Sequence, residues 1–119
     1  MNYDWLDGYL LEKPGAEKEH QPEWQATKYM LRGKMFVMIG GDKQEKPIAT
    51  FKLEPAHGEL LRQQYKEVVP GYYMNKTHWN SLYLEGSVPD DVVMGMADEA
   101  YRLVLASLPK KVQREILPE

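Results

Sequence analysis

The most chemically varied stretch of this 119-residue sequence is Asn75-Lys76-Thr77-His78-Trp79-Asn80. Lys76 and His78 can meet phosphate groups. Asn75 and Asn80 carry amides able to pair with an adenine edge, and Trp79 offers a plane for stacking. The same residues also suit a polar turn before a strand, in which Trp79 belongs to the core and the Asn and His side chains bind the backbone. Both interpretations stay open at this point.

Basic residues gather in the middle of the chain. The net charge is minus 3, but residues 26–80 carry nine Lys and Arg against five acids, while residues 1–25 and 81–119 are acidic. A basic segment in an acidic protein can concentrate anions locally. An ordinary solvated surface of mixed charge explains the same excess. The candidate phosphate contacts in this segment are Lys28, Arg32, Lys34, Lys43 and Lys46, and Lys76, His78 and Asn80 are further candidates.

Other chemistries find little support in the residues. His20, His57 and His78 show no metal-ligand spacing, and the chain has no cysteine, which excludes thiolate ligands and a Cys nucleophile. No nucleophile-elbow or phosphate-loop pattern surrounds the serines or Gly40-Gly41. The three histidines are read as surface or turn residues. We therefore expect a protein without a metal, a cofactor or an enzymatic activity.

The elements that must position these residues form one α+β domain spanning residues 1–119. Asn2 can cap a first helix, and residues 17–23 are expected to be a charged loop. Strands are expected at 24–31, 34–39, 48–53 and 79–84, with a short one at 72–74. Helices are expected from Pro55 and from a Ser87 cap to Leu108, with a short turn or helix at 110–117. The order predicts an antiparallel sheet of about four to five strands flanked by helices.

Two short connections are the candidate phosphate-binding loops. Arg32-Gly33 predicts a tight hairpin turn, and Gly40 to Lys46 predicts a polar loop before the third strand. The longest nearly apolar run, Met35 to Ile39, is far shorter than the roughly 20 residues needed to cross a bilayer. The first residues carry no signal-peptide pattern. We expect a cytoplasmic protein, monomeric and without a membrane segment.

Several motifs in order resemble the MmcQ/YjbR family along nearly the whole chain. They are Lys13-Pro14-Gly15-Ala16, Trp24-Gln25-Ala26-Thr27, Gly33-Lys34-Met35-Phe36, Leu60-Leu61-Arg62-Gln63-Gln64, the run from Val69 to Asn80, Tyr101, and Leu108-Pro109. The resemblance implies a compact α+β fold similar to CyaY and frataxin, described as a double-wing arrangement that binds nucleic acid. The wings would then be the loops at Arg32 to Lys34 and at Gly40 to Lys46.

Two functions from different classes follow from these observations. The first is a small DNA-binding protein whose basic wing loops contact phosphates. The second is a binding module for a small molecule or a protein, with one face of the sheet as the contact surface. An excess of aromatic residues beyond what a core needs would favour the second function. Those aromatics are Trp5, Trp24, Tyr29, Tyr72, Tyr73 and Tyr83.

Overall fold

The structure is a computed structural model that describes residues 2–23, 25–71 and 75–118. The elements follow in the order α1 (Leu6–Leu11), β1 (Ala16–Gln21), β2 (Ala26–Leu31), β3 (Lys34–Gly41), β4 (Pro47–Lys52), α2 (Pro55–Gln64), β5 (Val68–Pro70), β6 (Trp79–Tyr83), α3 (Asp90–Ala106) and α4 (Lys110–Ile116). The strands form one antiparallel sheet in the order β1-β2-β3-β4-β6-β5. The predicted α+β class is confirmed, with six strands in the place of four or five. The expected strand at 72–74 lies outside the described residues.

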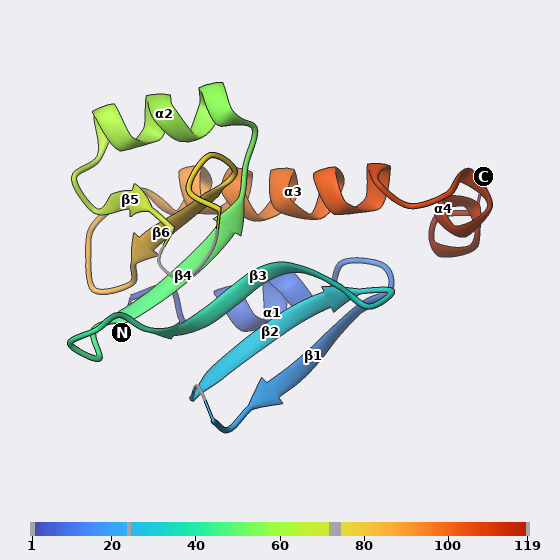
Figure 1. Ribbon diagram of the computed structural model, residues 1–119, viewed down its shortest axis with the longest axis horizontal. Helices are drawn as coiled ribbons and strands as arrows, with labels where there is room; N and C mark the ends of the chain where they lie inside the picture. Colours follow the sequence, from blue (N-terminus) through green and yellow to red (C-terminus); the bar gives the residue numbers. More distant parts are fainter. Residues whose placement is uncertain (1, 24, 72–74, 119) are drawn as a thin grey trace.

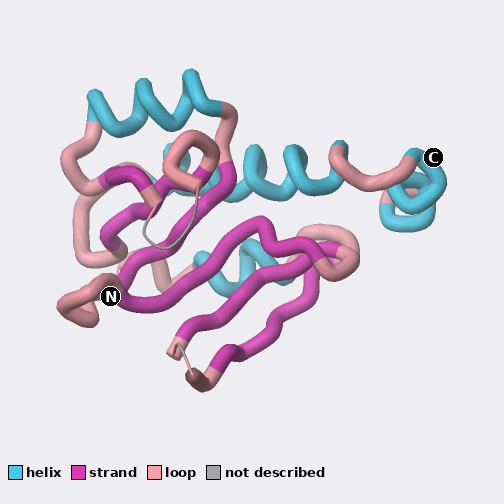
Figure 2. The backbone as a smooth tube through the Cα atoms, in the orientation of Figure 1, coloured by secondary structure: helices cyan, strands magenta, loops and turns pink. Residues whose placement is uncertain are grey.

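The helices α1 and α3 cover one face of the sheet (Figures 1 and 2). Phe36 of β3 packs edge-on against Tyr101 of α3, with ring centroids 5.6 Å apart. Tyr29 of β2 donates a hydrogen bond to Asp7 of α1 at 2.7 Å on the same side. A single hydrophobic core between helices and sheet includes Leu6, Leu10, Tyr29, Leu31, Phe36, Phe51, Leu82, Met96 and Val104. The opposite face of the sheet has no described helix packed across it (Figure 1).

A β-bulge interrupts the ladder between β2 and β3. Tyr29 pairs with Val37 and Met30 pairs with Met35, so Phe36 is an extra residue on the β3 side. A bulge of this kind lets two consecutive side chains lie on the same face. Phe36 and Val37 are both fully buried in the core as a result.

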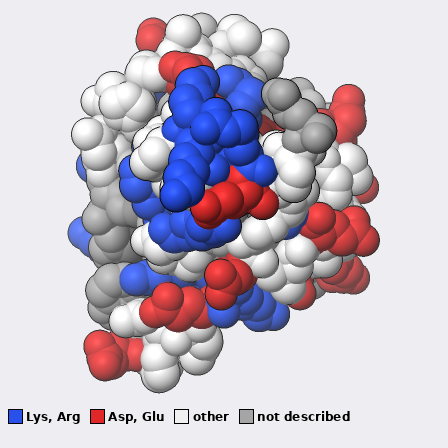
Figure 3. All heavy atoms as spheres, turned by 90° about the vertical axis from the view of Figure 1, so that its right-hand side faces the viewer, with Lys and Arg blue, Asp and Glu red and all other residues white. Residues whose placement is uncertain are grey.

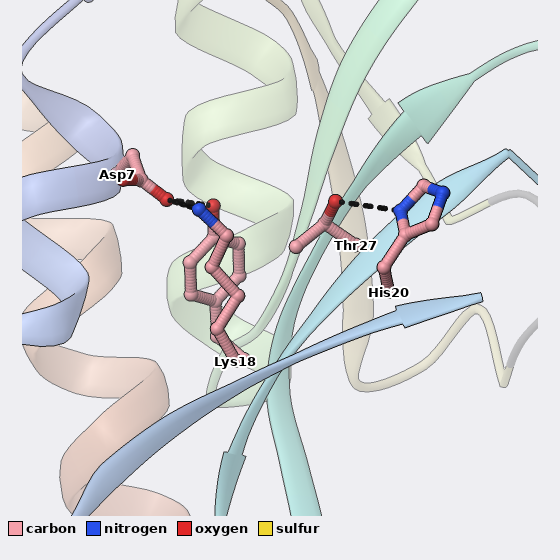
Figure 4. A network of polar contacts seen from close by, with 5 residues as sticks. Asp7, Lys18, His20 and Thr27 are labelled. Atoms are coloured by element: carbon pink, nitrogen blue, oxygen red, sulfur yellow. Dashed lines mark hydrogen bonds and ion pairs between the residues drawn. The ribbon is translucent and has the colours of Figure 1, made fainter. Parts of the chain in front are cut away.

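The segment predicted as a charged loop at residues 17–23 is largely a strand, because Ala16–Gln21 forms the edge strand β1. Its exposed side chains lack an apolar alternation, which is why the pattern did not indicate a strand. Figure 4 shows two contacts that tie it to its neighbours. Lys18 Nζ lies 2.9 Å from Asp7 Oδ1 on α1, and His20 Nδ1 lies 3.5 Å from Thr27 Oγ1 on β2.

Two predicted helix caps are wrong. Asn2 does not cap α1, because its amide donates to the Gly86 carbonyl at 2.6 Å instead. Ser87 does not cap α3, since its hydroxyl and its backbone N–H both point to Glu67 and the helix begins after Pro89. Asn2 instead joins the N-terminal segment to the β6–α3 connection, and Ser87 joins that connection to Glu67.

Candidate nucleic-acid interface

The β2–β3 turn places two cations at one end of the sheet. Arg32 and Gly33 form a two-residue turn in which both backbone φ angles are positive, 48° and 82°. This is the type I′ geometry that matches the twist of a hairpin, and Gly33 adopts it without a side-chain penalty. Leu31 and Lys34 pair across the turn, so the predicted hairpin is confirmed. Arg32 and Lys34 are both exposed.

The helix α4 supplies three more cations at the same end. Pro109 is the N-cap residue of this helix, where its missing N–H costs nothing because N–H groups at a helix start have no internal partner. Val112 and Ile116 are partly buried against the core. Lys110, Lys111 and Arg114 are exposed. The side of α4 that faces solvent is therefore basic.

Two contacts join the turn to the α3–α4 corner. Arg32 Nη1 lies 3.0 Å from Glu115 Oε1 of α4. Lys34 Nζ donates to Ser107 Oγ, just after α3, at 3.3 Å. We call the resulting group the basic end and define it as Arg32, Lys34, Lys110, Lys111 and Arg114. Figure 3 views the molecule from this end and shows Lys and Arg side chains gathered into a patch beside a few acids.

The turn between α1 and β1 holds α4 in place. Gly15 has a positive φ of 77°, and a Cβ there would lie 3.0 Å from Leu31 Cδ1 and 3.3 Å from Ile116 Cγ2. A glycine thus allows α4 to pack closely against this turn. Tyr101 of α3 donates a hydrogen bond to the Pro14 carbonyl at 2.5 Å. The basic end therefore rests on contacts between segments far apart in the sequence.

Lys13 is a cation that the structure uses internally. Its Nζ lies 2.6 Å from Asp98 Oδ1 and 4.7 Å from the centre of the Tyr9 ring, and its side chain is only 15% exposed. The hydroxyl of Tyr9 donates to the same carboxylate, and this bond raises the pKa of Tyr9 to about 12. These contacts fasten the start of the α1–β1 turn to α3.

Lys43 and Lys46 do not join the basic end. They lie in the β3–β4 loop, where Asp42 Oδ1 accepts hydrogen bonds from the backbone of Gln44 and Lys46 at 2.8 and 2.9 Å. The β3 strand has eight residues, so roughly 24 Å separates this loop from Lys34. The two predicted wings therefore occupy opposite ends of one strand (Figure 1).

The other predicted contacts are also dispersed. Lys28 lies within β2, opposite Met38 of β3. Lys76 Nζ donates to the Gly71 carbonyl at 2.7 Å. His78 is partly buried, and its carbonyl accepts from the Leu53 N–H at 2.7 Å. The structure therefore brings together only two of the predicted contacts, Arg32 and Lys34.

The expectation that Asn80 contacts a base is wrong. Asn80 is fully buried because its side chain points from β6 towards α2, where its Oδ1 accepts a hydrogen bond from Arg62 Nη1. Its Nδ2 has no hydrogen-bond partner among the residues that the structure describes. Asn80 thus has a structural role, but it contacts a side chain of α2 and not the backbone that the structural alternative expected.

The residues that sequence reasoning missed are Lys110, Lys111 and Arg114. The run Pro109-Lys110-Lys111-Val112-Gln113-Arg114 holds three cations in six residues, and that local density was the available signal. The net negative charge of residues 81–119 obscured this local cluster of cations. The proximity of the cluster to Arg32 could not be predicted from the sequence.

The histidines and carboxylates do not form a metal site within residues 2–23, 25–71 and 75–118. His57, expected as a plain surface residue, instead lies with Nδ1 2.8 Å from Glu99 Oε1. The other oxygen of Glu99 accepts from the Glu54 N–H at 2.8 Å and so satisfies a donor at the start of α2. This pair joins α2 to α3. Across the same described ranges, no helix is both long and apolar enough to span a bilayer.

The aromatic residues are mostly engaged in packing. Tyr29 is buried, Tyr83 donates to Asp42 Oδ2 at 2.9 Å, and Trp5 packs edge-on against Tyr9 at 5.7 Å. Trp24, Tyr72 and Tyr73 lie outside the described residues. Of the described members of that set, Tyr83 is the one whose side chain lies on the face of the sheet opposite α1 and α3.

The fold and the site define the class of protein: an α+β domain with a six-stranded antiparallel sheet and a basic end. Residues 11–103 match the YjbR family, and the chain belongs to this family. It is 34% identical over 114 residues to uncharacterized protein YjbR of Escherichia coli strain K12, covering 96% of both chains. Uncharacterized protein YbdF of Escherichia coli O157:H7 is 30% identical over 82% of this chain and 77% of its own.

Solved structures show the same fold. The crystal structure of Deinococcus radiodurans protein DR2400, a DUF419 domain, superposes with a TM-score of 0.85 at 24% identity and covers 97% of this chain and 87% of its own. A Pseudomonas syringae protein superposes with a TM-score of 0.75 at 19% identity, over 87% of this chain and 98% of its own.

Proposed function

We propose that this protein is a small DNA-binding domain without enzymatic activity, and that its basic end contacts the phosphates. The observation that carries this proposal is the meeting of the β2–β3 turn with α4, linked through Arg32 and Glu115 at 3.0 Å. We also propose that the protein is cytoplasmic and monomeric.

The charges at the basic end suit phosphate binding. Five cations stand there with one paired acid, although the whole chain has a net charge of minus 3. Arg and Lys are the side chains that most often meet DNA phosphates, and such contacts do not depend on base sequence. Because each neutralised phosphate releases counterions, affinity should fall with salt by a slope of about 0.9 per contact.

Charge reversal on α4 tests the proposal. Lys110→Glu/Lys111→Glu changes two exposed residues in the first turn of α4, where acids suit the helix dipole and the fold should survive. Binding to a labelled DNA duplex is measured by fluorescence anisotropy at about 50 and about 200 mM salt. We expect affinity to fall at least about tenfold at the lower salt, and the salt slope to drop by about 2.

The matched control is Lys43→Glu/Lys46→Glu, which makes the same charge change in the β3–β4 loop. These residues are exposed and lie at the far end of β3. The control should lose much less affinity than the α4 variant. Equal losses for the two variants would mean that only net charge matters, and the proposed interface would then be wrong.

A second function is supported by the face of the sheet opposite α1 and α3. Met30, Met35, Trp79 and Tyr83 lie on that face by the strand register, and each is partly exposed. We propose a planar apolar ligand as the alternative occupant. Such a ligand should quench the fluorescence of Trp79 at micromolar concentration, and this quenching should disappear in Trp79→Phe. A diverse ligand panel that leaves the fluorescence unchanged would exclude it.

A further inference from the structure

The side chains at the basic end indicate how DNA would be recognised, if the proposed function holds. We infer that this end binds the backbone of duplex DNA and does not read base sequence or unpaired bases. The inference rests on the proposed function and adds the kind of nucleic acid. It follows from what the amides, the rings and the guanidinium groups near this end are already bonded to.

The amide that α4 could offer to a base is already occupied. Gln113 Nε2 donates to the Leu108 carbonyl at 2.7 Å and is 3.4 Å from the Ala106 carbonyl. These bonds close the corner between α3 and α4. Asn and Gln are the side chains that pair with adenine, so their engagement removes a main route to sequence reading.

The two asparagines near β6 are also committed to the fold. Asn75 Oδ1 accepts from the Thr77 N–H at 2.7 Å, and Asn80 is buried against Arg62. Neither residue belongs to the basic end. The amides that first pointed to base reading therefore stabilise a turn and a helix contact.

Aromatic stacking is not available at the basic end among the described residues. Tyr101, the ring on α3 closest in sequence to α4, is only 7% exposed, packs against Phe36 and donates to Pro14. The five residues of the basic end and those of α4 include no ring. Binding of single strands depends strongly on stacking, at about 1–3 kcal/mol per base. A duplex, which presents phosphates without unstacked bases, fits this surface better.

The guanidinium groups limit sequence reading further. Arg32 Nη1 is paired with Glu115, and Arg114 is the arginine of the basic end that has no acidic partner among the described residues. One arginine paired with a guanine would discriminate at one base pair only, by about 1–3 kcal/mol.

The spacing of the cations on α4 suits the DNA backbone. Lys110 and Arg114 are one helical turn apart, about 6 Å along the axis, which corresponds to about two phosphates of one strand.

Glu115 should act as an internal competitor for phosphate. Its side chain and that of Arg32 are both close to half exposed, at 46% and 43%. A phosphate that binds Arg32 competes with this carboxylate for Nη1 and is repelled by its negative charge. Glu115→Gln should therefore raise the affinity for every duplex by a similar factor of about two- to fivefold.

The test is a competition experiment with the full chain. Anisotropy of a labelled duplex is measured while two unlabelled duplexes of unrelated sequence and a single strand of equal length compete. We expect the two duplexes to agree within about threefold and the single strand to compete at least about tenfold less well. Glu115→Gln should raise the affinity for both duplexes by the same factor.

Three other results have separate meanings. A preference of more than about tenfold for one duplex, or a single strand that competes as well as the duplexes, would overturn this inference and leave the proposed function standing. An unequal effect of Glu115→Gln on the two duplexes would also overturn it. Failure of the labelled duplex to bind at low salt would overturn the proposed function, and the inference with it.

Discussion

Substitution of Gly58 by alanine should destabilise the protein, although alanine is the better helix former. Gly58 is buried in the first half of α2, and a Cβ there would lie 2.6 Å from Asn80 Nδ2 and 2.9 Å from Asn80 Oδ1. Contacts this short require the amide to move. That amide is fully buried and accepts the hydrogen bond from Arg62, so it has little room to do so.

The magnitude follows from one stabilising and two destabilising terms. Replacing glycine by alanine within a helix stabilises by about 1 kcal/mol. Overpacking costs about 1–3 kcal/mol, and loss of a hydrogen bond to a charged group costs about 1.5–3 kcal/mol. Together these terms lower the free energy of unfolding by about 1.5–5 kcal/mol, or by about 0–2 kcal/mol if the hydrogen bond survives.

Gly95→Ala is the matched control. Gly95 is exposed in α3, and a Cβ there would meet no atom within 4 Å. This variant should be more stable than the wild type by up to about 1 kcal/mol. The unfolding of both variants in urea is monitored by tryptophan fluorescence. The comparison requires that the free energy of unfolding depends on urea concentration with the same slope in both variants.

A double-mutant cycle isolates the contact itself. In an Asn80→Ala background the clash is gone, so Gly58→Ala should become neutral or stabilising. The reasoning would be refuted if Gly58→Ala were as stable as Gly95→Ala in the wild-type background. It would also be refuted if the effect of Gly58→Ala were the same with and without Asn80.

Three further predictions concern the framework of the site. Gly15→Ala should lower the free energy of unfolding by about 1–2 kcal/mol, because its φ of 77° disfavours a side chain, and urea unfolding measures this. Phe36→Ala should cost about 3–5 kcal/mol in the same assay, since Phe36 is fully buried at the bulge. The pKa of Asp7 is lowered from 3.8 by hydrogen bonds from Tyr29 and Lys18. The stability that this carboxylate contributes is therefore present above pH 3.8 and lost as the pH falls through the lowered pKa. Asp7→Asn should be less stable than the wild type near pH 7. The difference between their free energies of unfolding should become smaller in acid, which unfolding curves at several pH values measure.

Much of the fold could be predicted from the sequence where apolar periodicity or turn chemistry is strong. The Arg32-Gly33 hairpin and the long helix up to Leu108 carry such signals, and both are present. The β1 strand could not be found this way, because an edge strand with four exposed central residues has no buried side to reveal it. The three-residue strand β5 ends at Pro70 and is too short for a pattern.

The candidate site was harder to predict than the fold. Successive loops of an antiparallel meander lie at opposite ends of the sheet, so the loops before Lys34 and after Gly41 had to be separated. That consequence of the predicted topology was available from the sequence. The approach of α4 to Arg32 was not, because it depends on Gly15 and Ile116 packing across 101 positions of the chain.

The β-bulge also decides which side chains of β3 reach the core beyond the hairpin turn. Side chains alternate between the two faces of a strand, and one extra residue reverses that parity for everything beyond it. Lys34 pairs with Leu31 directly across the turn, so both lie on the side of α3, and Lys34 reaches Ser107 at 3.3 Å. A regular ladder continued from this turn would place Val37 opposite Lys28 and turn it away from the helices. The extra residue at Phe36 thus lets one strand present the cation of the turn and the apolar side chains of its far half on the same side of the sheet.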